Sequence, residues 1–169
     1  MLGKLQEIAH QTADDLGKLR IDKWKTDSSN KKQSQSNADA LQRNLTAALP
    51  EMIQKAQAAP QQLGPSFRLY RNLNVVYDVL SATAETAGAF GPKEQYQLLA
   101  TDTEQLDQLR RGMADRLDWL SGIKDSQIVQ LHQQLASAQQ AAAKAKQETK
   151  AEEPEKKPKK KVTHKKKSE

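Results

Sequence analysis

Residues 92–123 read PKEQYQLLATDTEQLDQLRRGMADRLDWLSGI and carry the clearest structural signal in the chain. The large apolar residues that recur every seven positions are Leu99, Leu106, Met113 and Leu120. Further apolar side chains occupy neighbouring positions at Leu109, Leu117 and Ile123. This spacing places them on one face of an α-helix. The stretch therefore predicts a long amphipathic helix that packs against other helices.

The helical pattern continues beyond Gly122 as a narrower stripe. Its members are Ile128, Leu131, Leu135 and Ala138, spaced like the a and d positions of a coiled coil. A helix over 92–143 would be roughly 78 Å long, against about 33–36 Å for the first and third predicted helices. We therefore expect its second half to project as a stalk, fold back at Gly122 or meet a partner. The four stripe residues are candidates for self-association, as a homodimer or with another protein.

Three shorter helices are predicted before this one. Apolar spacing indicates a first helix over 2–25, and the polar stretch 26–37 predicts a connection. A second helix reaches residue 59, and Pro50 interrupts it without shifting its stripe, so a kink is expected. A third helix follows Ser66 and ends at the glycines of 88–92, which predict a left-handed C-cap.

The sequence as a whole predicts an all-α protein. Ala (22), Gln (20) and Leu (19) dominate the composition, and all three suit helices. We expect a four-helix up-and-down bundle over 1–122 and a helical extension over 123–143, a candidate coiled coil. Residues 144–169 predict a disordered basic tail, because they combine dense charge with two prolines and a single large apolar residue.

The net charge of +6 resides in that tail. Residues 1–143 hold 16 basic and 16 acidic side chains, whereas 144–169 hold 11 lysines and 5 glutamates. The candidate polyanion-binding residues are Lys156, Lys157, Lys159, Lys160, Lys161, Lys165, Lys166 and Lys167. Because 156–167 lacks arginine and aromatic residues, we expect no base reading. The tail predicts non-specific adhesion to an anionic polymer or membrane surface.

Catalytic and cofactor signatures are missing from the sequence. Cysteine is absent, and no G-x-S-x-G, Walker A or G-x-G-x-x-G pattern occurs. A di-iron bundle needs two Glu-x-x-His pairs, but Glu7 and His10 form the one pair, since Val129 stands three residues before His132. We predict a non-enzymatic protein with no cofactor, no metal and no small-molecule substrate.

The aromatic residues allow two interpretations. Trp24, Trp119, Tyr70 and Tyr77 are expected to be the largest core side chains of an aromatic-poor bundle. The alternative is that they line a cleft for an aromatic ligand.

Several stretches resemble a family of uncharacterised helical proteins of soil bacteria of the acidobacterial type, which are usually predicted to be exported. They are 20–25 (RIDKWK), 41–45 (LQRNL) with 48–50 (ALP), 67–73 (FRLYRNL) and 87–91 (AGAFG). The resemblance covers about residues 13–120, and the lysine- and proline-rich C-terminus is also similar. It implies a location in the cell envelope and no particular activity.

The function expected from these features is structural or interactive. The helical head binds a protein partner, and the cationic tail adheres to anionic surfaces. The alternatives are a nucleic-acid-associated accessory protein and a helical protein that coats lipid or granules. No hydrophobic signal-peptide core follows Met1. We expect a periplasmic or exported protein if a leader precedes Met1, and a cytoplasmic one if Met1 is the true start.

Overall fold

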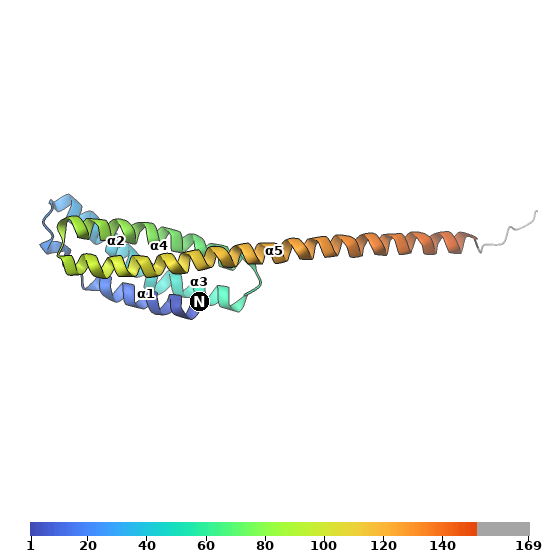
Figure 1. Ribbon diagram of the computed structural model, residues 1–169, viewed down its shortest axis with the longest axis horizontal. Coiled ribbons are helices and arrows are strands. Elements are labelled where there is room, and N and C mark those ends of the chain that lie inside the picture. Colours follow the sequence, from blue (N-terminus) through green and yellow to red (C-terminus); the bar gives the residue numbers. More distant parts are fainter. Residues whose placement is uncertain (152–169) are drawn as a thin grey trace, which may run out of the picture. The chain divides into compact units, whose positions relative to one another are not determined.

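The computed structural model describes residues 1–151, with side chains described through residue 147, and these residues are helical without any strand (Figure 1). The elements are α1 (Leu2–Gly17), η1 (Ile21–Lys23), α2 (Ser28–Arg43), η2 (Asn44–Ala48), α3 (Leu49–Ala58), α4 (Leu63–Phe90) and α5 (Lys93–Ala151). The chain divides into two units, Met1–Lys124 and the part from Asp125 onward. α2, η2 and α3 follow one another without a break and together form one helix, so the predicted all-α fold, with four helices and a long final one, is confirmed.

The first unit is an up-and-down bundle. α1 packs against the continuous path of α2 and α3, and α4 packs against α2 and α3 in turn. The beginning of α5 runs beside α4 (Figure 1), where Gly88 and Tyr96 are in close contact. The heptad residues of α5 form its part of the core: Leu99, Leu106, Met113 and Leu120 are each at most 1% exposed. The stripe that predicts the fold is therefore the buried face of α5.

The predicted connection over 26–37 is wrong, because α2 already begins at Ser28. The backbone N–H of Asn30 donates a 2.8 Å hydrogen bond to Oδ1 of Asp27, which caps the helix. Two exposed side-chain hydrogen bonds follow, each between residues four positions apart: Gln33 donates to Asn37, and Gln35 donates to Asp39. An N-cap and local side-chain pairs thus support a helix that has almost no apolar stripe to reveal it.

The first helix ends at Gly17, short of the predicted residue 25. The next residues form the short helix η1, and the chain then carries Trp24 into the core. At Pro50 the predicted continuity is confirmed, since a π-helical turn, η2, joins α2 to α3 without a break. Proline lacks the N–H that an α-helical turn needs, and a wider turn absorbs the mismatch.

The junction of α4 and α5 differs from the predicted left-handed cap. Gly91, the residue after α4, has a φ of −96°, and no glycine among residues 1–151 has a positive φ. A Cβ at Gly91 would lie 2.9 Å from the carbonyl oxygen of Ala87 and 3.0 Å from Nε1 of Trp24. Glycine is needed here because the backbone approaches the indole closely.

α5 is one helix from Lys93 to Ala151, so it continues through Gly122 and beyond the predicted end near residue 143. Alanine, lysine and glutamine are good helix formers, which explains why the helix continues beyond residue 143. The remaining predicted tail, 152–169, lies outside the described residues. None of the described helices is both long and apolar enough to cross a membrane.

Candidate functional site

The predicted self-association residues lie on an exposed face of α5 in the second unit. We call Ile128, Leu131, Leu135 and Ala138 the α5 seam; its three large members are 50%, 61% and 57% exposed, respectively. Spacings of three and four residues put them on one stripe of the helix. Residues 126–143 contain no Asp, Glu, Lys or Arg. The α5 seam is thus an apolar stripe on an uncharged stretch of helix.

The aromatic residues follow neither interpretation completely. Trp24 is buried as predicted, but Trp119 is 60% exposed, so its prediction as a core residue is wrong. Neighbouring helical residues point in directions about 100° apart, and Leu120 takes the inward position. Tyr70 borders an open groove of about 530 Å³ between α4 and α5, together with Phe67 and Leu117. Of the four aromatic residues proposed for a ligand cleft, Tyr70 alone borders this groove.

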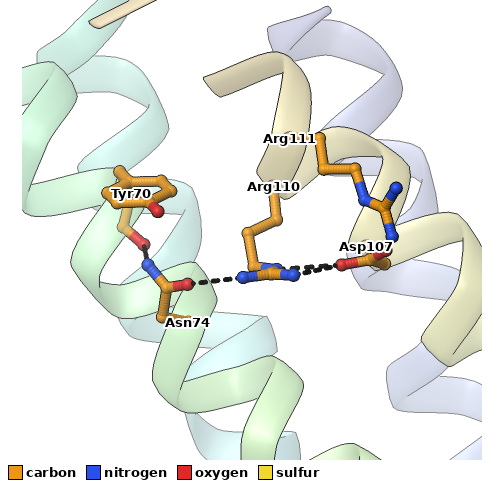
Figure 2. A network of polar contacts seen from close by, with 5 residues as sticks. All are labelled: Tyr70, Asn74, Asp107, Arg110 and Arg111. Carbon is orange, nitrogen blue, oxygen red and sulfur yellow. Dashed lines mark hydrogen bonds and ion pairs between the residues drawn. The ribbon is translucent and has the colours of Figure 1, made fainter. Parts of the chain in front are cut away.

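Arg110 is the centre of a polar network that joins α4 to α5 (Figure 2). Its Nη1 donates to Oδ1 of Asn74 over 3.1 Å, and its Nε donates to Oδ1 of Asp107 over 3.0 Å. The guanidinium carbon lies 4.5 Å from the ring centroid of Tyr77. Arg111 forms a second ion pair with Asp107, at 2.6 Å. Asn74 also donates to the backbone oxygen of Tyr70.

The charges of this network stabilise each other. The hydrogen bond from Arg110 holds the pKa of Asp107 below its ordinary value, and the same bond raises the pKa of Arg110. Both groups remain ionised, and their strong partners leave neither able to exchange a proton near neutral pH. The Arg110 network is therefore a structural tie between two helices.

An open pocket of about 500 Å³ lies between α1 and α5 in the first unit. Its lining residues are Gln11, Asp15, Glu94, Gln97, Leu98, Thr101, Asp102 and Gln105. All except Leu98 present a side-chain oxygen, and none is basic. We call this the acidic pocket. It brings several chemically active side chains together.

Two carboxylates of the acidic pocket are buried, with Asp15 3% and Asp102 2% exposed. Asp102 stands three residues after Leu99 and four before Leu106, so it shares their inward face. Asp15 is paired: Lys18 Nζ lies 2.7 Å from its Oδ1, and Gln11 Nε2 donates to its Oδ2 over 2.8 Å. By contrast, Oδ2 of Asp102 and Oγ1 of the fully buried Thr12 have no hydrogen-bond partner within residues 1–151.

These surroundings drive the two pKa values apart. Burial, reinforced by the charge of Asp15, raises the pKa of Asp102 to about 7, although the charge of Lys18 opposes the shift. Burial also disfavours the charged form of Asp15, but Lys18 and Gln11 outweigh it and hold the pKa of Asp15 below its ordinary value. Asp15 is therefore ionised near neutral pH, and Asp102 exchanges its proton there.

Sequence reasoning missed the acidic pocket. Asp102 interrupts the apolar stripe between Leu99 and Leu106, and Thr12 and Asp15 similarly interrupt the stripe of α1 before Leu16. A polar residue at a core position was the available signal. Such a signal within one helix does not show that the polar residues of α1 and of α5 face each other. That depends on how the two helices pack, although they are far apart in the sequence.

Glu7 and His10, the one Glu-x-x-His pair of the sequence, are exposed on α1. Nowhere in the described part of the chain do three or more His, Cys, Asp or Glu side chains lie close enough to hold a metal ion. The eight tail lysines of 156–167 lie outside the described residues.

Comparisons with protein-family models, with curated proteins and with solved structures found no match for this chain. The side chains themselves are therefore the grounds for proposing a function.

Proposed function

We propose that this protein is a non-enzymatic interaction protein that self-associates through the α5 seam and adheres to anionic surfaces through its lysine tail. The observation that carries the proposal is the exposure of Ile128, Leu131 and Leu135, each at least half exposed, on an uncharged stretch of helix. A location in the cell envelope belongs to the same proposal, and the resemblance described above supports it.

Burial of the α5 seam supplies the driving force for association. Each fully buried Leu or Ile contributes about 1.5–3 kcal/mol, and pairing two seams covers the large apolar side chains of both copies. The seam is short, because it contains two a and two d positions. Self-association is therefore expected to be weak and to depend on concentration.

A second copy of the chain is the partner that the sequence favours. Foreign coiled-coil partners are usually selected by charges at the flanking e and g positions. Here the positions beside the seam include Gln127, His132, Gln134 and Gln139, and 126–143 contains no acidic or Lys/Arg side chain. Two identical helices can therefore pair without repulsion between like charges, and glutamines can hydrogen-bond across the contact.

Sedimentation equilibrium of the full chain tests this proposal. We expect the average mass to rise with protein concentration, and the double substitution Leu131→Asp with Leu135→Asp to give a monomer. The matched control is Gln133→Asp with Gln140→Asp, which adds the same charge at f positions, away from the seam. The control should associate like the unaltered chain. A monomer at every concentration, or equal dissociation of both variants, would contradict self-association.

The tail is tested separately, by replacing its eight lysines of 156–167 with glutamine in the full chain. Binding to vesicles containing phosphatidylglycerol should be lost, whereas replacement with arginine should preserve it, because charge alone is needed. Binding to duplex DNA should weaken with salt, with a log–log slope of about −7 for eight phosphate contacts. A preference for duplex DNA that survives in half-molar salt would replace this proposal with the nucleic-acid alternative.

A further inference from the structure

We propose that the acidic pocket binds a small primary ammonium ion of an organic amine, with Asp102 as the principal acceptor of its N–H groups. This inference is independent of the α5 seam and of the tail. It rests on the charge of the pocket, on one unpartnered acceptor in its wall and on its size.

The charge of the acidic pocket favours a cation. Three carboxylate side chains line it, Asp15, Glu94 and Asp102, and no lysine, arginine or histidine does. Lys18 is the basic residue whose charge acts on Asp102, and its largely exposed side chain is already bonded through its ammonium to Asp15. One lysine leaves the charge of the pocket negative, so a cationic ligand is attracted and an anionic one is repelled.

The hydrogen-bonding capacity of the wall matches an ammonium group. Asp102 is only 2% exposed and lines the pocket. Its Oδ2 accepts no hydrogen bond among the described residues. The torsion about its Cβ–Cγ bond is broad, so either carboxylate oxygen can turn toward a ligand. A primary ammonium carries three N–H donors and no acceptor. Its bonds to a carboxylate are charge-assisted and about twice as strong as neutral ones.

The size and the remaining lining favour an organic amine over a bare metal ion. Calcium needs six to eight oxygen ligands, and no group of three or more candidate metal ligands is gathered within residues 1–151. The volume of about 500 Å³ falls in the range of small-molecule sites. Leu98 supplies an apolar wall for an alkyl chain, and Thr101 and Gln105 supply further acceptor oxygens.

Titration of the isotope-labelled full chain with n-butylammonium, followed by two-dimensional NMR at mildly alkaline pH, tests the proposal. We expect saturable shifts of the amides of Gln11, Thr12 and Asp15 in α1 and of 97–105 in α5, with a Kd of about 1 mM for so small a ligand. Tetramethylammonium has the same charge and no N–H donor, so it should bind at least tenfold more weakly. Equal binding of tetramethylammonium or Mg²⁺, or no saturable shift with butylammonium, would overturn the proposal.

The variant Asp102→Asn locates the site. It keeps the shape of the side chain and should weaken butylammonium binding at least tenfold. The matched control is Asp115→Asn, which removes an equal charge from an exposed position of the same helix and should leave binding unchanged. Thermal unfolding followed by circular dichroism confirms that both variants are folded. Equal binding by both variants would contradict the role of Asp102.

Discussion

The indole Nε1–H of Trp24 donates a 2.8 Å hydrogen bond to Oε1 of Gln95, a buried contact between residues 71 positions apart. Trp24 follows η1 in the connection between α1 and α2, and Gln95 lies in the first turn of α5. The backbone N–H of Lys25 also donates to the carbonyl oxygen of Phe90 over 2.8 Å. Two connections at one end of the bundle are thereby fixed to each other.

Replacing Trp24 with phenylalanine should destabilise the protein by about 2–4 kcal/mol, because it leaves a void in the core and a buried Gln95 oxygen without its donor. Urea unfolding followed by circular dichroism measures the change. The matched control is Trp119→Phe at the exposed tryptophan, which should change the free energy of unfolding by less than about 0.5 kcal/mol. Similar losses for both variants would contradict the importance of the Trp24–Gln95 bond.

The glycines at positions 91 and 122 should respond in opposite ways to alanine. Gly91→Ala places a Cβ within 3.0 Å of the Ala87 carbonyl and the Trp24 indole, and should cost about 1–3 kcal/mol. At Gly122, inside α5, a Cβ meets nothing within 4 Å, so alanine should stabilise the helix by up to about 1 kcal/mol. Thermal unfolding compares the two. Stabilisation by Gly91→Ala would show that the backbone at the α4–α5 junction moves easily.

The bundle could be predicted from the sequence wherever large apolar residues recur at helical spacing. Leu99, Leu106 and Met113 are an example, because their period alone indicates both the helix and its buried face. The helix over 28–37 could not be predicted in this way. Its support comes from the Asp27 cap and from pairs of polar side chains, which leave no periodic apolar pattern.

Of the two candidate sites, one could be predicted from the sequence and the other could not. The α5 seam is local, since Leu131 and Leu135 are neighbours on one helix and their stripe is visible in the sequence. The acidic pocket depends on contact between α1 and α5, whose members Asp15 and Asp102 are far apart along the chain. Which residues of two helices face each other is decided by packing of the whole bundle, and no spacing within one helix encodes it.

Because of the Arg110 network, replacing Arg110 should destabilise the protein more than replacing its neighbour Arg111. Arg110→Ala removes the bonds to Asn74 and Asp107 and the contact with Tyr77, so it should cost about 1–2 kcal/mol. Arg111→Ala removes one ion pair of a mainly exposed side chain and should cost less than about 1 kcal/mol. Lysine at position 110 should not restore stability, because a single ammonium cannot reproduce the planar fork. Urea unfolding of the three variants measures these differences.

Asp102 and the paired carboxylates should make stability depend on pH in opposite directions. The pKa values of Asp15 and Asp107 are lowered by folding, so their contribution to stability is lost as the pH falls below about 4. The pKa of Asp102 is instead raised to about 7. Between about pH 4 and 7 the folded protein then holds a proton that the unfolded chain has released, so stability falls as the pH rises through this window.

Asp102→Asn should remove this fall, since asparagine cannot ionise. Each pKa unit corresponds to about 1.4 kcal/mol. From about pH 4 to about pH 7, the free energy of unfolding of the variant should therefore rise by about 2–4 kcal/mol relative to that of the unaltered chain. Urea unfolding at a series of pH values gives the difference directly. Asp115→Asn, at an exposed position of α5, should follow the unaltered chain throughout. If the curves of Asp102→Asn and the unaltered chain ran parallel, Asp102 would have to be ionised in the folded protein as readily as in the unfolded chain.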